Sequence, residues 1–147
     1  MSTAHPEEHV RPMNIGDQLP RVERLIDQDQ VERYARASGD FNTVHIDNEF
    51  AKSSQFGRTI AHGMLIAASI SEVMTTAFKV DWLRSGRMKL RFRAPVFPGD
   101  TIVAQGEIKD IREQAGKREA ICSVDVRKRD GELVISGEAT VSVPLDA

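Results

Sequence analysis

The sequence has little cysteine and no excess of positive charge. Cys122 is the single cysteine among 147 residues, which excludes an internal disulfide framework and a cysteine-rich zinc site. Lysine and arginine together number 20, against 22 aspartate and glutamate residues, for a formal net charge of −2. A general binder of nucleic acid or of anionic membranes usually carries a clear basic excess. We therefore expect no nucleic-acid partner and no membrane partner.

Long apolar runs and nucleotide-binding glycine motifs are also missing. The longest apolar stretch, residues 61–70, is too short and interrupted to span a bilayer, and the first 13 residues lack the apolar region of a secretory signal. Neither GxGxxG nor GxxxxGK[ST] occurs. We expect a cytoplasmic chain with a flexible segment at 1–13 and one domain at 14–147, working without a metal ion or a redox cofactor.

Helical periodicity is confined to the first half of the sequence. Asp27 is a candidate N-cap for a helix that ends near Ser38 and Gly39, and residues 39–49 are rich in glycine, aspartate and asparagine, as in a loop. A short helical turn is expected at 49–53. The longest pattern, residues 62–78, is apolar over most of its circumference, which predicts a helix buried nearly all round.

The second half alternates with a period of two, typical of strands with one buried face. Four such segments are separated by turn residues at 98–100, 115–116 and 130–131. Together with an extended segment near residues 14–26, they predict a four-strand antiparallel meander that follows two helices. The pattern favours an α+β hot-dog domain, in which one antiparallel sheet wraps around the long buried helix.

Chemically useful side chains gather in the expected loop and at the start of the long helix. Asp40 and His45 are five residues apart, about 140° on a helix, so only an irregular loop brings them together. A carboxylate and an imidazole suit proton exchange near neutral pH, and the amide of Asn42 is able to orient a partner. His62 and Gly63 open the helix, where the Gly63 N–H is a candidate donor to a developing oxyanion.

These residues resemble the motifs of the MaoC-like family of (R)-specific enoyl-CoA hydratases and 3-hydroxyacyl dehydratases. The first motif is matched by Ser38-Gly39-Asp40, Asn42, His45 and Asp47, and the second by Ala61-His62-Gly63-Met64. Residues 90–96 and 98–100 resemble the strand and turn that follow in the family. Thr43 stands where the family usually has proline, so this loop lacks the fixed φ that proline supplies.

The resemblance implies a hot-dog fold and the hydration of trans-2-enoyl thioesters to (R)-3-hydroxyacyl thioesters, or the reverse. Asp40 and His45 would hold one water at the β-carbon, and the Gly63 N–H would bind the thioester oxygen. Asn42 and His62 would support the site. The expected substrate is an acyl-CoA, or an acyl group on acyl carrier protein, and the expected assembly is a homodimer or a higher oligomer of dimers.

Other interpretations stay open. A hot-dog thioesterase would use the same scaffold, and a non-catalytic subunit or acyl-carrier-binding partner would need an active homologue. The basic row Arg87, Lys89, Arg91 and Arg93 suits either a solvated strand face or a grip on substrate phosphates. Phe56, Met64 and Leu65 are candidates for the lining of an acyl tunnel. Cys122 alternates with buried positions, so we expect a structural thiol.

Overall fold

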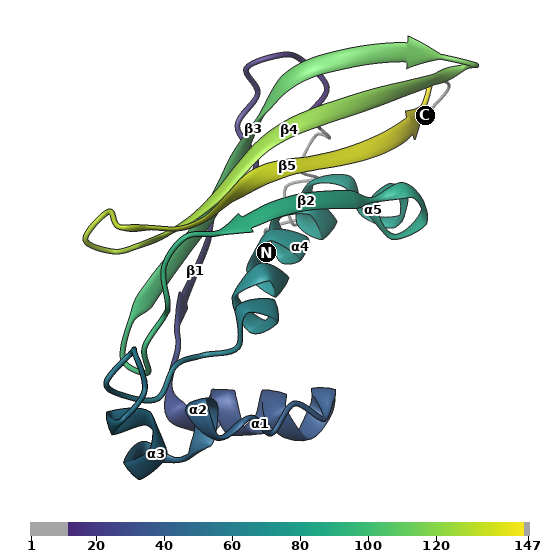
Figure 1. Cartoon of the computed structure of the whole chain (residues 1–147). Helices are drawn as coiled ribbons and strands as arrows, with labels where there is room; N and C mark the ends of the chain where they lie inside the picture. Colours follow the sequence, from purple (N-terminus) through teal and green to yellow (C-terminus); the bar gives the residue numbers. More distant parts are fainter. Residues whose placement is uncertain (1–11, 146–147) are drawn as a thin grey trace, which may run out of the picture.

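The chain forms one antiparallel sheet and five helices in a computed structural model that describes residues 12–145 (Figure 1). The expected flexible segment at 1–13 lies almost wholly outside the described residues. The elements, in chain order, are β1 (Val22–Leu25), α1 (Gln28–Ser38), α2 (Thr43–Ile46), α3 (Asn48–Lys52), α4 (Gly63–Phe78), α5 (Val80–Ser85), β2 (Arg87–Phe92), β3 (Thr101–Gln114), β4 (Lys117–Lys128) and β5 (Leu133–Pro144).

The strand order is β1-β3-β4-β5-β2, so the predicted four-strand meander is wrong in one respect. Strands β3, β4 and β5 do form consecutive hairpins, but β2 crosses over and pairs with β5, with Phe92 opposite Ile135. Alternation of side chains assigns each residue to a face of the sheet, but it carries no information about which strand is the neighbour. As a result, β1 and β2 are the two edges of the sheet.

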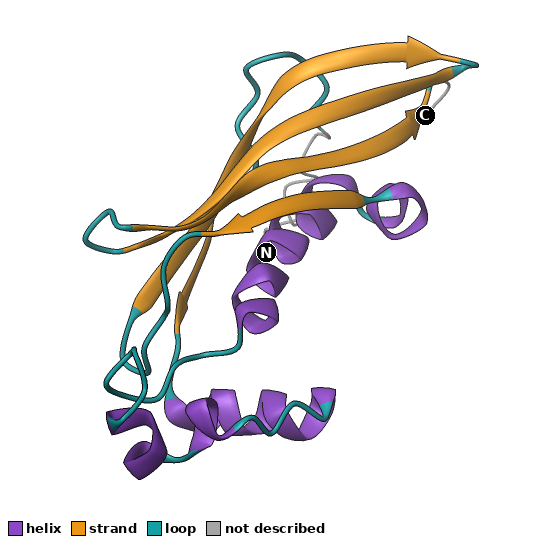
Figure 2. Ribbon diagram, in the orientation of Figure 1, coloured by secondary structure: helices purple, strands orange, loops and turns teal. Residues whose placement is uncertain are grey.

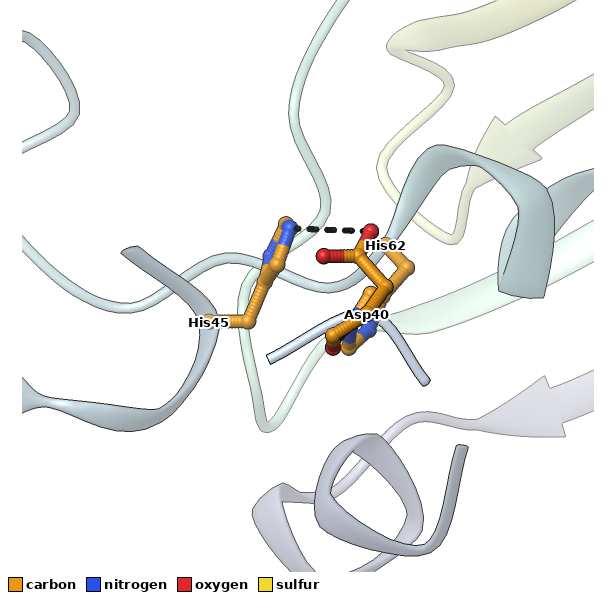
Figure 3. A group of neighbouring side chains, drawn as sticks. All are labelled: Asp40, His45 and His62. Carbon is orange, nitrogen blue, oxygen red and sulfur yellow. Dashed lines mark hydrogen bonds and ion pairs between the residues drawn. The ribbon is translucent and has the colours of Figure 1, made fainter. Parts of the chain in front are cut away.

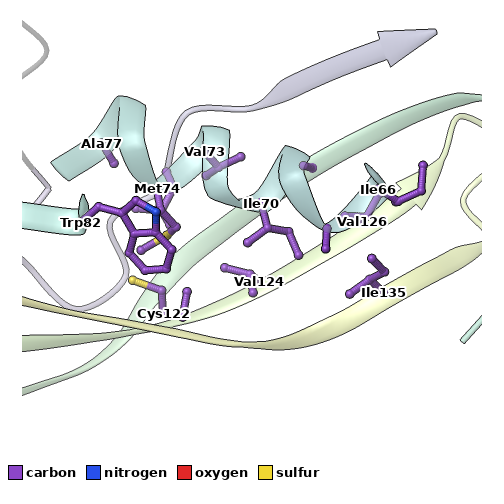
Figure 4. Close-up of a cluster of buried hydrophobic side chains, with 14 of the residues drawn as sticks. Ile66, Ile70, Val73, Met74, Ala77, Trp82, Cys122, Val124, Val126 and Ile135 are labelled. Carbon is purple, nitrogen blue, oxygen red and sulfur yellow. The ribbon is translucent and has the colours of Figure 1, made fainter. Parts of the chain in front are cut away.

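Helix α4 lies along the concave face of the sheet, as the α+β hot-dog prediction requires (Figure 2). Ile70, Val73 and Met74 of α4 are fully buried, and they lie with Cys122 and Val124 of β4 in one apolar core (Figure 4). The helix is not buried all round, however. Met64 is 61% exposed in the first turn, because the sheet covers the middle and the end of α4 more completely than its beginning.

Helices α1, α2 and α3 form a separate group at one end of the sheet, close to the start of α4 (Figure 1). Asp27 caps α1 as predicted, accepting a hydrogen bond from the Gln30 N–H at 2.8 Å. The expected loop at 39–49 contains two short helices, α2 and the beginning of α3. Helix α5, which packs on β5, carries no strong sequence signal. Among the described residues, no helix is both long enough and apolar enough to cross a membrane.

Candidate active site

Asp40 lies immediately after α1, where the chain turns sharply. Gly39 ends the helix in the left-handed conformation, with φ of 77°, and its N–H donates to the Ala35 carbonyl at 2.9 Å. Glycine adopts this conformation without the steric cost that a Cβ brings. The Asp40 Oδ1 accepts a hydrogen bond from the Asn42 N–H at 3.2 Å. The Asp40 side chain remains 52% exposed, so its carboxylate is accessible to a ligand.

His45 lies in the short helix α2, whose position is set by Asn42. The Asn42 Oδ1 accepts from the Val44 N–H at 3.2 Å and so caps α2. Asn42 therefore acts on the site through the backbone: its side-chain oxygen accepts from the Val44 N–H and not from the His45 imidazole. Gln28 of α1 braces the same helix, because its Nε2 donates to the His45 carbonyl at 2.9 Å.

The His45 imidazole is held in one tautomer by a backbone contact. Its Nδ1 lies 2.8 Å from the Ile60 carbonyl oxygen, and because a carbonyl only accepts, Nδ1 carries the proton. In the neutral ring, Nε2 then has a free lone pair. That atom lies 4.0 Å from the Asp40 Oδ2 (Figure 3). The separation exceeds a direct hydrogen bond, but a water about 2.8 Å from each atom would bridge them at an angle of about 90°.

His62 touches both members of this pair. Its Nε2–H donates to the Asp40 carbonyl at 2.9 Å, and its ring stacks on the His45 ring with centroids 3.9 Å apart and planes inclined by 26°. The Tyr34 ring lies on it at 4.8 Å, tilted by 59°. His62 is only 2% exposed, and its Nδ1 has no hydrogen-bond partner within residues 12–145. A buried acceptor left in this state costs about 1–3 kcal/mol.

Gly63 is the first residue of α4 and lines a pocket of about 340 Å³ beside the pair. Its N–H precedes those of Leu65 and Ile66, which both donate to the His62 carbonyl, so it has no acceptor in the preceding turn of the helix. A Cβ at Gly63 would lie 2.9 Å from Cε1 of Phe92, whose ring therefore covers this glycine closely. The helix start thus offers an amide donor to a ligand in the pocket.

The pocket is mainly apolar, and neither Asp40 nor His45 is among its lining residues. Ile60, whose carbonyl holds the imidazole, is one of its lining residues, and Arg93 is its charged member. The full lining is Phe56, Ile60, Ala61, Gly63, Ile66, Phe92, Arg93, Ala94, Pro95, Val96 and Val134. Of the three expected tunnel residues, Phe56 belongs to it. Met64 and Leu65 do not, because in α4 their side chains project from other sides of the helix than Gly63 and Ile66.

One further motif residue and two further sequence predictions can be compared with their surroundings. Asp47 caps α3, accepting from two backbone N–H groups. Cys122 is buried as predicted, and burial raises the pKa of its thiol to about 12. The basic row is exposed along β2 and just beyond it, where Arg87 pairs with Glu119 and the Arg93 Nε donates to the Ser136 Oγ at 3.2 Å.

A metal ion is a poor fit to the site. Asp40, His45 and His62 each offer a ligand atom, and these atoms lie within 4.8 Å of one another. The lone pairs of an imidazole lie in its ring plane, and the two rings are stacked, so their lone pairs do not converge on a common point. In addition, the His45 Nδ1 and the His62 Nε2 already bond backbone carbonyls. The arrangement suits proton transfer to and from a water better than metal binding.

The structure brings together Asp40, His45 and His62, with Gly63 next to His62 at the start of α4 and Asn42 as a helix cap. The roles of these residues stay predictions. Sequence reasoning missed the contributions of Gln28, Ile60 and Phe92. For Ile60 no signal existed, because a backbone carbonyl is available at every residue. For Phe92 the available signal was its alternation with Arg91 and Arg93, which places it on the face of β2 that contacts α4.

Comparison with known proteins supports the family that the two motifs resemble. The family model described as MaoC like domain matches residues 12–130. A mitochondrial 3-hydroxyacyl-acyl-carrier-protein dehydratase of Solanum lycopersicum is 35% identical over 132 residues, which cover 90% of this chain and 78% of the relative. An (R)-specific enoyl-CoA hydratase of Aeromonas caviae is 32% identical over 127 residues, which cover 86% of this chain and 93% of the relative.

Solved structures extend the agreement to the backbone. The (R)-hydratase from A. caviae involved in PHA biosynthesis superposes with a TM-score of 0.77 at 30% identity, over 90% of this chain and 98% of that one. The hot-dog prediction for the single domain is thereby confirmed. With a matching family model over most of its length and relatives above 30% identity, this chain belongs to the MaoC-like domain family.

Proposed function

We propose that this protein catalyses the reversible hydration of trans-2-enoyl thioesters to (R)-3-hydroxyacyl thioesters. The observation that carries the proposal is the facing pair of His45 Nε2 and Asp40 Oδ2, 4.0 Å apart, beside an apolar pocket that begins at the Gly63 amide. The names of the similar hydratase and dehydratases support the same hydro-lyase chemistry.

Asp40 and His45 would divide the proton transfers between them. One side chain accepts a proton from the bridging water while the oxygen of that water forms a bond to the β-carbon. The other side chain, initially protonated, donates a proton to the α-carbon, so the double bond gains one hydrogen and one hydroxyl. The next water carries the proton back across the 4.0 Å gap and restores the pair. Both groups act from the same side, which gives addition to one face of the double bond.

The Gly63 amide would stabilise the charge that develops on the thioester oxygen. Attack at the β-carbon moves electrons through the α-carbon to this oxygen, which becomes enolate-like before the α-carbon is protonated. A donor fixed in advance at this position acts mainly in the transition state. The start of α4 contributes an additional field of the correct sign, worth about 0.3–1 kcal/mol at exposed sites.

The test is turnover of crotonyl-CoA by the wild type, Asp40→Asn and His45→Gln. We expect each variant to lower kcat by about 10²–10⁴-fold, as loss of a positioned acid or base does. Asp47→Asn is the matched control, since the Asp47 carboxylate accepts from two backbone N–H groups at the start of α3 and asparagine also caps a helix. Normal turnover by either site variant contradicts the assignment.

Product analysis in the same assay separates the hydratase from its alternatives. A 3-hydroxyacyl thioester identifies hydration, whereas free CoA identifies a thioesterase. Activity that appears only after a homologous partner is added identifies a non-catalytic subunit. The intact Asp40 and His45 pair supports hydration by this chain itself.

For the thiol carrier, we propose coenzyme A in preference to acyl carrier protein. The exposed basic row offers Lys89 and Arg91 to phosphate groups, and Arg93 extends this charge to the rim of the pocket. The comparison to make is kcat/KM for crotonyl-CoA against crotonyl-acyl carrier protein, in the wild type and in a Lys89→Gln/Arg91→Gln variant. A higher kcat/KM for the carrier protein contradicts the proposal.

We also propose that the protein works as a homodimer. The edge strand β2 has unpaired backbone groups on one side, and it carries the exposed apolar side chains of Met88 and Phe92. Pairing of this edge with a second copy would satisfy those groups and place the two pockets near the interface. Sedimentation equilibrium should give about twice the 16.4 kDa mass of the chain, and a monomer mass contradicts the proposal.

A further inference from the structure

We propose that His62 is a positioning residue that fixes the position of Asp40 and the ring orientation of His45 relative to each other. The inference rests on the proposed hydratase function, and it assigns His62 a role distinct from proton transfer. His62 uses two different parts of its ring for the two partners: an N–H for Asp40 and the ring face for His45. Figure 3 shows the three side chains together, although they come from three separate segments of the chain.

The contact with Asp40 fixes the backbone from which the carboxylate projects. Asp40 follows the end of α1, and its side chain is half-exposed, with the Asn42 N–H as its hydrogen-bond donor. The bond from the His62 Nε2–H to the Asp40 carbonyl, at 2.9 Å, ties this segment to the start of α4. Since α4 is packed in the hydrophobic core, this bond restricts the movement of the Asp40 backbone relative to the core.

The contact with His45 fixes the plane of the second imidazole. The Nδ1–H bond to Ile60 holds one ring edge but still permits the ring to tilt about that bond. Stacking on His62, at 3.9 Å between centroids, restricts this tilt and so directs Nε2 towards Asp40. The His62 ring also packs against the Tyr34 ring, with centroids 4.8 Å apart, and this contact holds the His62 ring itself in place.

The unpartnered Nδ1 of His62 argues against a purely structural role. A phenyl ring would stack on His45 and pack in the same space without burying an unsatisfied nitrogen. What the imidazole adds over a phenyl ring is the Nε2–H donor to Asp40. His62 therefore lowers the stability of the fold through its unpaired Nδ1, and in return its Nε2–H fixes the geometry of the Asp40 and His45 pair.

Two substitutions separate the two contacts. His62→Phe retains the stacked ring and removes the donor, whereas His62→Gln places an amide NH₂ near the position of Nε2 and removes the ring. We expect each to lower kcat for crotonyl-CoA by about 10-fold or more, because displacements of about 1 Å at a catalytic group cost up to about 10²-fold. KM should stay within about threefold, since His62 does not line the pocket.

Double variants show through which partner each contact acts. In an Asp40→Asn background, His62→Phe should lower kcat no further, and in a His45→Gln background, His62→Gln should lower it no further. A merely structural role would instead give the same loss in every background, together with a lower Tm. Additive losses, a change confined to KM, or wild-type kcat in both single variants would each overturn the proposal.

A readout independent of turnover keeps this test separate from that of the proposed function. Imidazole ¹⁵N NMR of the wild type should show His45 protonated at Nδ1 and His62 protonated at Nε2. In His62→Gln, the His45 resonances should broaden or shift as the ring is released. Inactivity of the wild type on enoyl thioesters would refute the hydratase, whereas unchanged His45 resonances in His62→Gln would refute the positioning role of His62.

Discussion

Replacing Gly63 by proline would remove the proposed oxyanion donor with little change to the helix that carries it. Gly63 is the first residue of α4, a position at which proline is favoured because the N–H has no acceptor in the helix. The preceding residue, His62, has φ of −60° and ψ of 135°, which lies in the extended region that a following proline requires. The substitution thus deletes one N–H group from the pocket wall.

The size of the effect can be derived by pairing this variant with Gly63→Ala. Alanine and proline both introduce a Cβ, which would lie 2.9 Å from Cε1 of Phe92, but alanine keeps the N–H. Any displacement of the Phe92 ring is therefore common to both variants. The ratio of the two kcat values then measures the donor, for which a loss of about 10²–10³-fold, or 2.7–4 kcal/mol, is expected.

The assay follows loss of the conjugated enoyl thioester of crotonyl-CoA under saturating substrate. Thermal unfolding of both variants supplies the control. Their Tm values should lie within a few degrees of each other, because the structural change is confined to the start of one helix. Repeating the pair in a Phe92→Ala background removes the shared steric contact. Equal kcat values for Gly63→Pro and Gly63→Ala, in both backgrounds, would refute the role of this amide.

Three further substitutions test the local structure. Thr43→Pro should stabilise the protein by about 0.4–1 kcal/mol in urea unfolding with kcat unchanged, because Thr43 is the first residue of α2 and the ψ of Asn42, 129°, suits a following proline; a loss of stability would contradict this. Asp27→Ala should lower the free energy of unfolding by about 0.5–2 kcal/mol through loss of the cap on Gln30, and an unchanged Tm would show that this cap is energetically silent. Burial raises the pKa of the Cys122 thiol from its ordinary value of 9.0 to about 12, so above pH 9 the unfolded state loses its proton first and the free energy of unfolding should fall by about 1.4 kcal/mol per pH unit up to about pH 12. Alkaline unfolding of Cys122→Ala should lack this contribution, and an identical pH slope would contradict the burial of the thiol.

Local signals in the sequence predict local structure well in this protein. Asp27 and Gly39 mark the two ends of α1 because a cap and a left-handed turn depend on the residue itself. The period of two likewise assigns Cys122 and Val124 to the buried face of β4. Asn42 is a comparable signal for α2, which a prediction of loop at 39–49 overlooks.

Contacts between distant segments are less predictable for a physical reason. The place of β2 beside β5 depends on which edge of the β3–β5 hairpins is free to accept it, and both edges look alike in sequence. The hydrogen bonds from His45 to Ile60 and from His62 to Asp40 use backbone carbonyls, which every residue has, so no residue type indicates them in the sequence. The motifs therefore predict which side chains form the site, but not what holds them in place.

The pairing of β2 with β5 also has a consequence for how the chain folds during synthesis. Arg87 pairs with Thr140 and Phe92 with Ile135, partners roughly 50 residues apart, and long-range strand pairing of this kind slows folding. Helix α4 leaves the ribosome before every strand of the β3–β5 hairpins, so its apolar surface stays uncovered until the last of them has been made. A nascent chain that stops before β5 would therefore lose the partner of β2 as well, and would present α4 to chaperones and proteases.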